Sequence, residues 1–130
     1  ALVSITDGKS SINIYIPTDG YPDAVISDIK NFIELYKIRN IELPKELTPE
    51  LKALILYTAY VFDLPITYDI VDDVDYTYIV NIRNMAITIQ SRSKREKLTL
   101  KEAFSKYGKN KAYNVLYDKS IEKLISKLLK

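Results

Sequence analysis

The chain has 130 residues and carries 19 Lys and Arg against 17 Asp and Glu, so its net charge is close to neutral and its length fits one domain. It contains no Cys and no His, which excludes disulfides and thiolate metal sites and removes the usual general base near neutral pH. No apolar run approaches the ~18 residues of a membrane span and no signal-peptide pattern is present, so we expect a cytoplasmic protein that does not bind membranes.

Charge divides the chain into two parts. Residues 1–91 hold 7 Lys and Arg against 13 Asp and Glu, whereas residues 92–130 hold 12 against 4. We therefore predict an acidic α+β core over residues 1–91 and a basic helical segment over residues 92–130 that belongs to the same domain.

The chain opens with the pattern of a β-hairpin. Residues 2–6 read as a short strand, and Asp7-Gly8 is a turn signal. Ile12, Ile14 and Ile16 then alternate with polar residues, which predicts a second strand with one buried face.

The turn Asp19-Gly20-Tyr21-Pro22 is the predicted organising feature of the fold. Asp19 can accept hydrogen bonds from nearby backbone N–H groups, and Gly20 can take a positive φ. Tyr21 precedes proline and is pushed towards an extended conformation, so a helix should start at Pro22. Asp19 and Tyr21 could also be an acid and a phenol in a cleft, but turn chemistry accounts for both residues.

Two stretches together resemble a known family. They are the run from Ser11 to Asp23, which contains the Asp-Gly-Tyr-Pro turn, and the acidic and aromatic residues 73–82 with residues 85–89. The chain resembles small, mostly uncharacterised proteins of phages and archaeal viruses over residues 1–91. The resemblance implies a hairpin, a turn, a helix and a later hairpin, and it implies no activity. The single Gln and Met and the many Lys are typical of hyperthermophile proteins, although an AT-rich genome gives a similar bias.

Two helices are predicted after the turn. Val25, Ile29 and Phe32 follow helical spacing, so the first helix should close near Asn40. Thr48-Pro49 is a helix start, and the following helix is apolar nearly all round to Phe62, which predicts a centrally buried helix.

The second half begins with an extended piece at residues 66–71 and a hairpin of residues 76–82 and 85–90. Residues 91–97 read as a polar, basic connection. Thr99 and Glu102 match a capping box for a short helix that Gly108 ends. This order predicts a two-layer α+β fold: an antiparallel sheet of about four strands in two hairpins, helices packed on one face, and a helical C-terminal extension.

A metal site could be formed by an acidic cluster that comprises Asp69, Asp72, Asp73 and Asp75. Hard cations such as Mg²⁺ take carboxylate oxygens, but the spacing matches no EF-hand loop. We predict a solvated loop without a metal or another cofactor, and the absence of a triad or a glycine-rich phosphate loop predicts that the chain is not an enzyme. A carboxylate-metal enzyme is the third hypothesis.

Binding could reside in the basic segment or in the terminal helix. The basic side chains, which could contact phosphates or be a solvated helix face, are Arg92, Lys94, Arg95, Lys97, Lys101, Lys106, Lys109 and Lys111. The terminal stripe, which could contact a partner helix or the domain itself, is Ile121, Leu124, Ile125 and Leu128.

We therefore expect a non-enzymatic viral or archaeal accessory protein that binds a macromolecular partner, either a host protein or a second copy of itself. A viral protein would work in the host cytoplasm. The alternative is a nucleic-acid-binding module that uses residues 92–111.

Overall fold

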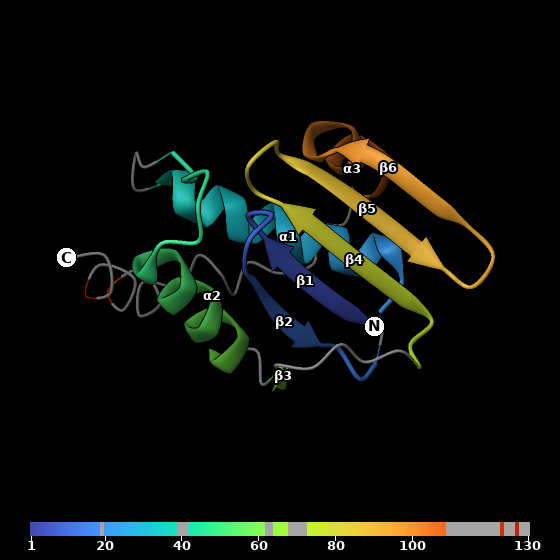
Figure 1. Ribbon diagram of the computed structural model, residues 1–130, viewed down its shortest axis with the longest axis horizontal. Coiled ribbons are helices and arrows are strands. Elements are labelled where there is room, and N and C mark those ends of the chain that lie inside the picture. Colours follow the sequence, from blue (N-terminus) through green and yellow to red (C-terminus); the bar gives the residue numbers. More distant parts are fainter. Residues whose placement is uncertain are drawn as a thin grey trace.

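The computed structural model describes residues 1–18, 20–38, 42–61, 64–67 and 73–108, together with Lys123 and Lys127. Over these residues the protein has an α+β fold with one sheet of six strands in the order β3-β2-β1-β4-β5-β6 (Figure 1). The strands are β1 (Leu2–Thr6), β2 (Ser11–Tyr15), β3 (Ile66–Thr67), β4 (Tyr76–Asn81), β5 (Ala86–Ser91) and β6 (Arg95–Thr99). The helices are α1 (Pro22–Ile38), α2 (Pro49–Val61) and α3 (Leu100–Tyr107).

The sheet is mixed, so the prediction of an antiparallel sheet was wrong. Both predicted hairpins are present, as β1–β2 and β4–β5. They join through β1 and β4, which run parallel, with Leu2 opposite Thr77 and Thr6 opposite Asn81. Alternation along a strand shows which face is buried but not the direction of the neighbouring strand. That direction depends on the path of the chain through α1 and α2, because parallel strands need a crossover connection.

The sheet has two more strands than the four that were predicted. β3 is a two-residue edge strand that pairs with β2, and β6 occupies residues predicted as a polar connection. In β6 the inward positions are Glu96 and Leu98, because Glu96 contacts Lys106 and Tyr107 of α3. A charged inward residue and outward basic residues make this strand look like a loop, yet both features are common in edge strands. β5 belongs to the predicted acidic core and β6 to the predicted basic segment, so the pairing of these two strands joins the two parts of the chain in one sheet.

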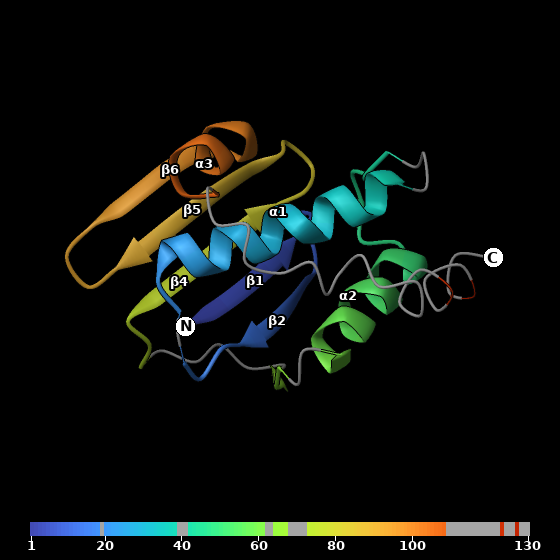
Figure 2. The same cartoon turned by 180° about the vertical axis from the view of Figure 1, so that it is seen from behind.

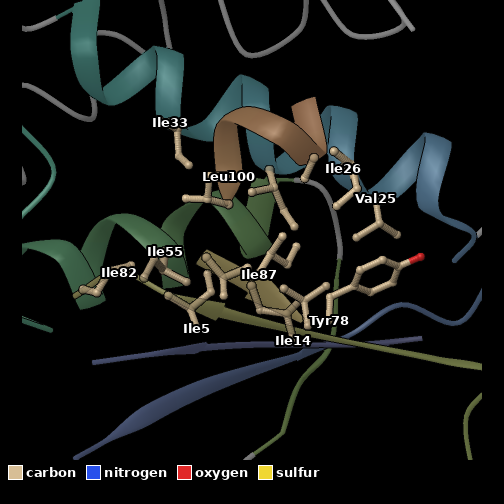
Figure 3. Close-up of a cluster of buried hydrophobic side chains, with 14 of the residues drawn as sticks. Ile5, Ile14, Val25, Ile26, Ile33, Ile55, Tyr78, Ile82, Ile87 and Leu100 are labelled. Carbon is tan, nitrogen blue, oxygen red and sulfur yellow. The ribbon is translucent and has the colours of Figure 1, made fainter. Parts of the chain in front are cut away.

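The helices form a second layer on one face of the sheet. α1 and α3 lie across that face in both views (Figures 1 and 2). The inner face carries two rows across the central strands: Val3, Tyr78 and Ile89, then Ile5, Val80 and Ile87. In Figure 3, Val25, Ile26 and Ile33 of α1 and Leu100 of α3 face these strands. The core is therefore the apolar layer between the sheet and the helices.

α2 is less central than its composition predicts. Leu51, Leu54 and Ile55 are buried in the core, but Leu56 is 37% exposed and Tyr60 is 79% exposed. The amphipathic helix α1 covers the central strands instead, and α2 stands beside it near β1 and β2 (Figure 2). The uniformly apolar sequence of α2 gave no indication of which side would face solvent.

The start of α1 differs in one detail from the predicted turn. Among the described residues, positive φ angles occur at Gly8 (92°) and Met85 (54°) and not at Gly20, so the turn does not use the positive φ that a glycine allows. Gly20 is needed for space, because a Cβ there would lie 2.4 Å from the Cβ of Ala1. The buried Tyr78 hydroxyl donates a hydrogen bond to the Gly20 carbonyl (2.7 Å) and fixes the turn to β4.

The capping box of α3 is confirmed. The Glu102 backbone N–H donates to the Thr99 hydroxyl (3.1 Å), and the Thr99 N–H donates to the Glu102 carboxylate (3.0 Å). The helix ends at Gly108, as predicted. None of the helices in the described part of the chain is both long enough and apolar enough to cross a membrane.

Candidate functional site

Gly20, Tyr21 and Pro22, the described residues of the predicted turn, lead into α1. Asp19 lies outside the described residues, Pro22 begins α1, and the Tyr21 side chain is 50% exposed. Gly20 contributes its carbonyl to the hydrogen bond with Tyr78. This hydrogen bond links the described part of the turn to β4.

The acidic cluster is described only in its second half, since Asp69 and Asp72 lie outside the described residues. Asp73 and Asp75 are exposed, and both lie beside Arg92, at 3.4 Å and 4.0 Å. Across the described ranges, no three His, Cys, Asp or Glu side chains come together in a way that could hold a metal ion. Arg92 is thus the nearest counter-charge to this half of the cluster.

The basic segment is dispersed over several surfaces. Arg92 pairs with the acidic cluster, while Lys94 and Lys106 both lie next to Glu96. The hydrogen bonds from Lys106 and then from Tyr107 hold the pKa of Glu96 below its ordinary value. Of the six Lys and Arg residues of the basic segment that the structure describes, half therefore have an acidic partner. Lys109 and Lys111 lie outside the described residues.

Arg95 and Lys97 project from the outer face of the sheet, opposite to the helices, because they alternate with Glu96 and Leu98. The outward positions of β4, β5 and β6 are Thr77, Ile79, Asn81, Ala86, Thr88, Gln90, Arg95, Lys97 and Thr99. None of these is acidic. No described helix lies over this part of the sheet (Figure 1). We call these nine residues the outer face.

The residues of the predicted partner helix, Ile121, Leu124, Ile125 and Leu128, lie outside the described residues. Lys123 and Lys127 are helical and exposed. Partner binding through this stripe stays a prediction.

An apolar hollow lies between α1, α2 and the inner face of the sheet. It has a volume of about 260 Å³ and opens partly to solvent; we call it the cleft. Its floor comes from β1, β2 and β4, including Val3, Ile5 and Val80. Ile29 of α1 and Ile55 of α2 form facing walls. Ile5, Ile33 and Ile55, all lining residues, are among the buried side chains in Figure 3.

The cleft exists because α2 does not fill the space beside α1. α1 presents Ala24, Val25, Asp28, Ile29 and Phe32 to the cleft, residues that share one face at helical spacing. Ala24 is small, which leaves room where a larger side chain would reach towards the floor. An apolar hollow among the described residues loses packing contacts and exposes apolar surface.

Polar groups are few in the cleft. They are Thr18, Asp28 and Thr58. The Thr58 hydroxyl donates to the Leu54 carbonyl within α2 (2.8 Å). Asp28 reaches solvent at the mouth, yet the surrounding protein desolvates its carboxyl and raises its pKa to about 6. A lone carboxyl among aliphatic side chains can orient a ligand, but it does not form a nucleophile and base pair with either threonine in the described geometry.

Comparisons with known proteins add no relative: neither models of protein families, nor curated proteins, nor solved structures match this chain. The resemblance to proteins of phages and archaeal viruses therefore stays a prediction from the residues that carry it.

Proposed function

We propose that the chain is a non-enzymatic binding protein whose site is the cleft, and that the occupant is a small amphiphile. The apolar chain of this molecule lies against the floor of the cleft, and its polar head lies at the mouth. The observation that carries the proposal is a partly open cavity of about 260 Å³ whose lining is almost entirely aliphatic.

Size and lining favour a small ligand. An apolar cavity of roughly 150 Å³ is sufficient to bind benzene, so the cleft has room for a longer hydrocarbon. Each methylene transferred from water into such a site contributes about 0.8 kcal/mol, before the cost of fixing the ligand. Lining residues such as Ile29, Ile55 and Val80 come from separate elements that pack through the core, so the site is largely formed before a ligand arrives.

The test is calorimetric titration with 1-octanol. Ala24→Leu places extra volume in the cleft and should weaken binding by about tenfold or more, because the ligand loses apolar contact. Ala53→Leu adds the same atoms to α2 at a position that does not line the cleft, so its binding should match the natural chain. Absence of octanol binding, or equal weakening by both substitutions, contradicts the proposal.

A second proposal concerns the macromolecular partner expected from the sequence. The outer face carries Arg95 and Lys97 and no carboxylate, which favours nucleic acid, since hydroxyl, amide and basic groups are the usual contacts to phosphate and sugar. With about two phosphates neutralised, affinity for duplex DNA should fall roughly tenfold between about 50 and 200 mM salt.

Arg95→Ser with Lys97→Ser should remove most of this binding, and Lys52→Ser, a change of the same charge type on α2, should not. Fluorescence anisotropy with a labelled duplex measures both effects. Binding that is insensitive to salt, or unchanged by the double substitution, would exclude the outer face as a nucleic-acid site.

A further inference from the structure

Asp28 stands out among the residues that line the cleft, because it is the only ionisable one of the described set. It lies one helical turn from Ala24 and Val25 on one side and from Phe32 on the other. An apolar residue at this position would complete the aliphatic wall. The sequence instead places a carboxyl at the mouth, where the head of an amphiphile would lie.

The described part of the chain supplies no counter-charge for this carboxyl. Asp28 takes part in none of the ion pairs or side-chain hydrogen bonds found among the described residues. Lys30, the next cation along α1, extends towards Gly108 beside α3, since its Cδ lies 3.3 Å from where a Cβ on Gly108 would stand. The other charged residue near the start of α1, Asp23, is acidic and exposed and does not line the cleft.

We infer that the cleft prefers an amphiphile whose head group is a protonated amine, with Asp28 as its anionic partner. This inference rests on the proposed function, because it names the head group of the ligand that the cleft would hold. Charge complementarity carries it: one carboxylate beside an aliphatic cavity matches one ammonium attached to a hydrocarbon chain.

The chemistry favours an amine over other heads of equal size. An alkylammonium has three N–H donors and no acceptor, so every donor direction can serve the carboxylate or water. Hydrogen bonds between charged partners are about twice as strong as neutral ones. A carboxylate head would instead be repelled by ionised Asp28, and an alcohol head gains a single hydrogen bond.

Binding of the amine should depend on pH. Burial raises the pKa of Asp28 to about 6, so the carboxyl is ionised at about pH 7.5 and mostly protonated at pH 5. An alkylamine keeps its charge at both values, as a lysine side chain does. The remaining described lining residues do not titrate. The preference for the amine should therefore be present at the higher pH and decline as the pH falls through about 6.

The experiment compares octylamine, 1-octanol and octanoate by calorimetric titration, all below their micelle concentrations. At about pH 7.5 octylamine should bind about tenfold or more tightly than 1-octanol, and octanoate should bind weakest. At pH 5 the advantage of octylamine should shrink to a few-fold or less.

Two variants assign the effect to Asp28. Asp28→Asn should abolish the preference for octylamine while 1-octanol still binds, and Asp23→Asn, a neutralisation on the same helix outside the cleft, should retain the preference. Equal binding of octylamine and 1-octanol by the natural chain overturns the inference and leaves the proposed function standing. Failure of all three molecules overturns both. An amine preference that survives Asp28→Asn assigns it to another acidic surface and also overturns the inference.

Discussion

The protein around Asp28 disfavours the ionised form of its carboxyl. Desolvation raises its pKa from an ordinary 3.8 to about 6 in the folded chain. The folded state therefore binds a proton more readily than the unfolded state between these values. The contribution of Asp28 to the free energy of unfolding is therefore greatest below about pH 4, and this contribution is lost as the pH rises through about 6.

Replacing Asp28 with Asn should consequently remove a penalty that exists only at higher pH. We expect the free energy of unfolding of Asp28→Asn, relative to the natural chain, to be higher at about pH 7.5 than at pH 4. Urea denaturation at both pH values measures the two differences. A difference that is the same at both would show that the carboxyl is not desolvated in the folded chain. The gain at higher pH should be modest, since the side chain reaches solvent.

At the scale of the elements, local sequence determines where α1 and α3 begin. Pro22 and the Thr99 capping box act through backbone groups within a few residues, so their effect can be predicted without the rest of the fold. The β4–β5 hairpin was predicted for the same reason. β6 was not, because inward Glu96 is accommodated by Lys106 and Tyr107 from α3, a contact that alternation does not report.

Contacts between distant elements account for the remaining differences between the predicted fold and the observed fold. The parallel pairing of β1 with β4 and the hydrogen bond from Tyr78 to Gly20 join segments more than fifty residues apart in sequence. The cleft depends in the same way on the relative positions of α1, α2 and three strands. One signal of it was present in the sequence, because Asp28 lies beside the apolar positions Val25, Ile29 and Phe32. An acidic residue near a helix start is also favoured by the helix dipole, so this signal alone does not indicate a cleft.

The capping box allows a direct test at this scale. Thr99→Ala removes the hydroxyl that accepts from the Glu102 backbone N–H and should lower the free energy of unfolding by about 1 kcal/mol. Lys101→Ala, an exposed substitution in the same first turn, should change it by no more than about 0.5 kcal/mol. Guanidinium denaturation provides both values. Equal effects would mean that the cap does not stabilise α3.

Over the whole molecule, folding redistributes the charge that the sequence separates. The acidic body and basic segment meet where Arg92 lies beside Asp73 and Asp75, and Glu96 accepts contacts from Lys94 and Lys106. Because the cations of these pairs are exposed, the pairs contribute little stability, but they reduce the number of cations that face a polyanion in the described structure. The cleft is the feature whose chemistry depends least on these surface charges, because its lining is apolar apart from Asp28 and two threonines.

Methyl NMR with labelled isoleucine δ1 carbons tests the central claim, ligand binding in the cleft, most directly. Isoleucines line the cleft from α1, α2 and the sheet, and Ile29, Ile55 and Ile82 report on its walls and floor. Ile79 lies on the outer face of the sheet and serves as an internal control. Titration with 1-octanol should shift the resonances of Ile29, Ile55 and Ile82 along a saturable curve and leave that of Ile79 in place. Unchanged cleft resonances at saturating 1-octanol, or shifts centred on Ile79, would contradict the assignment of the cleft as the binding site.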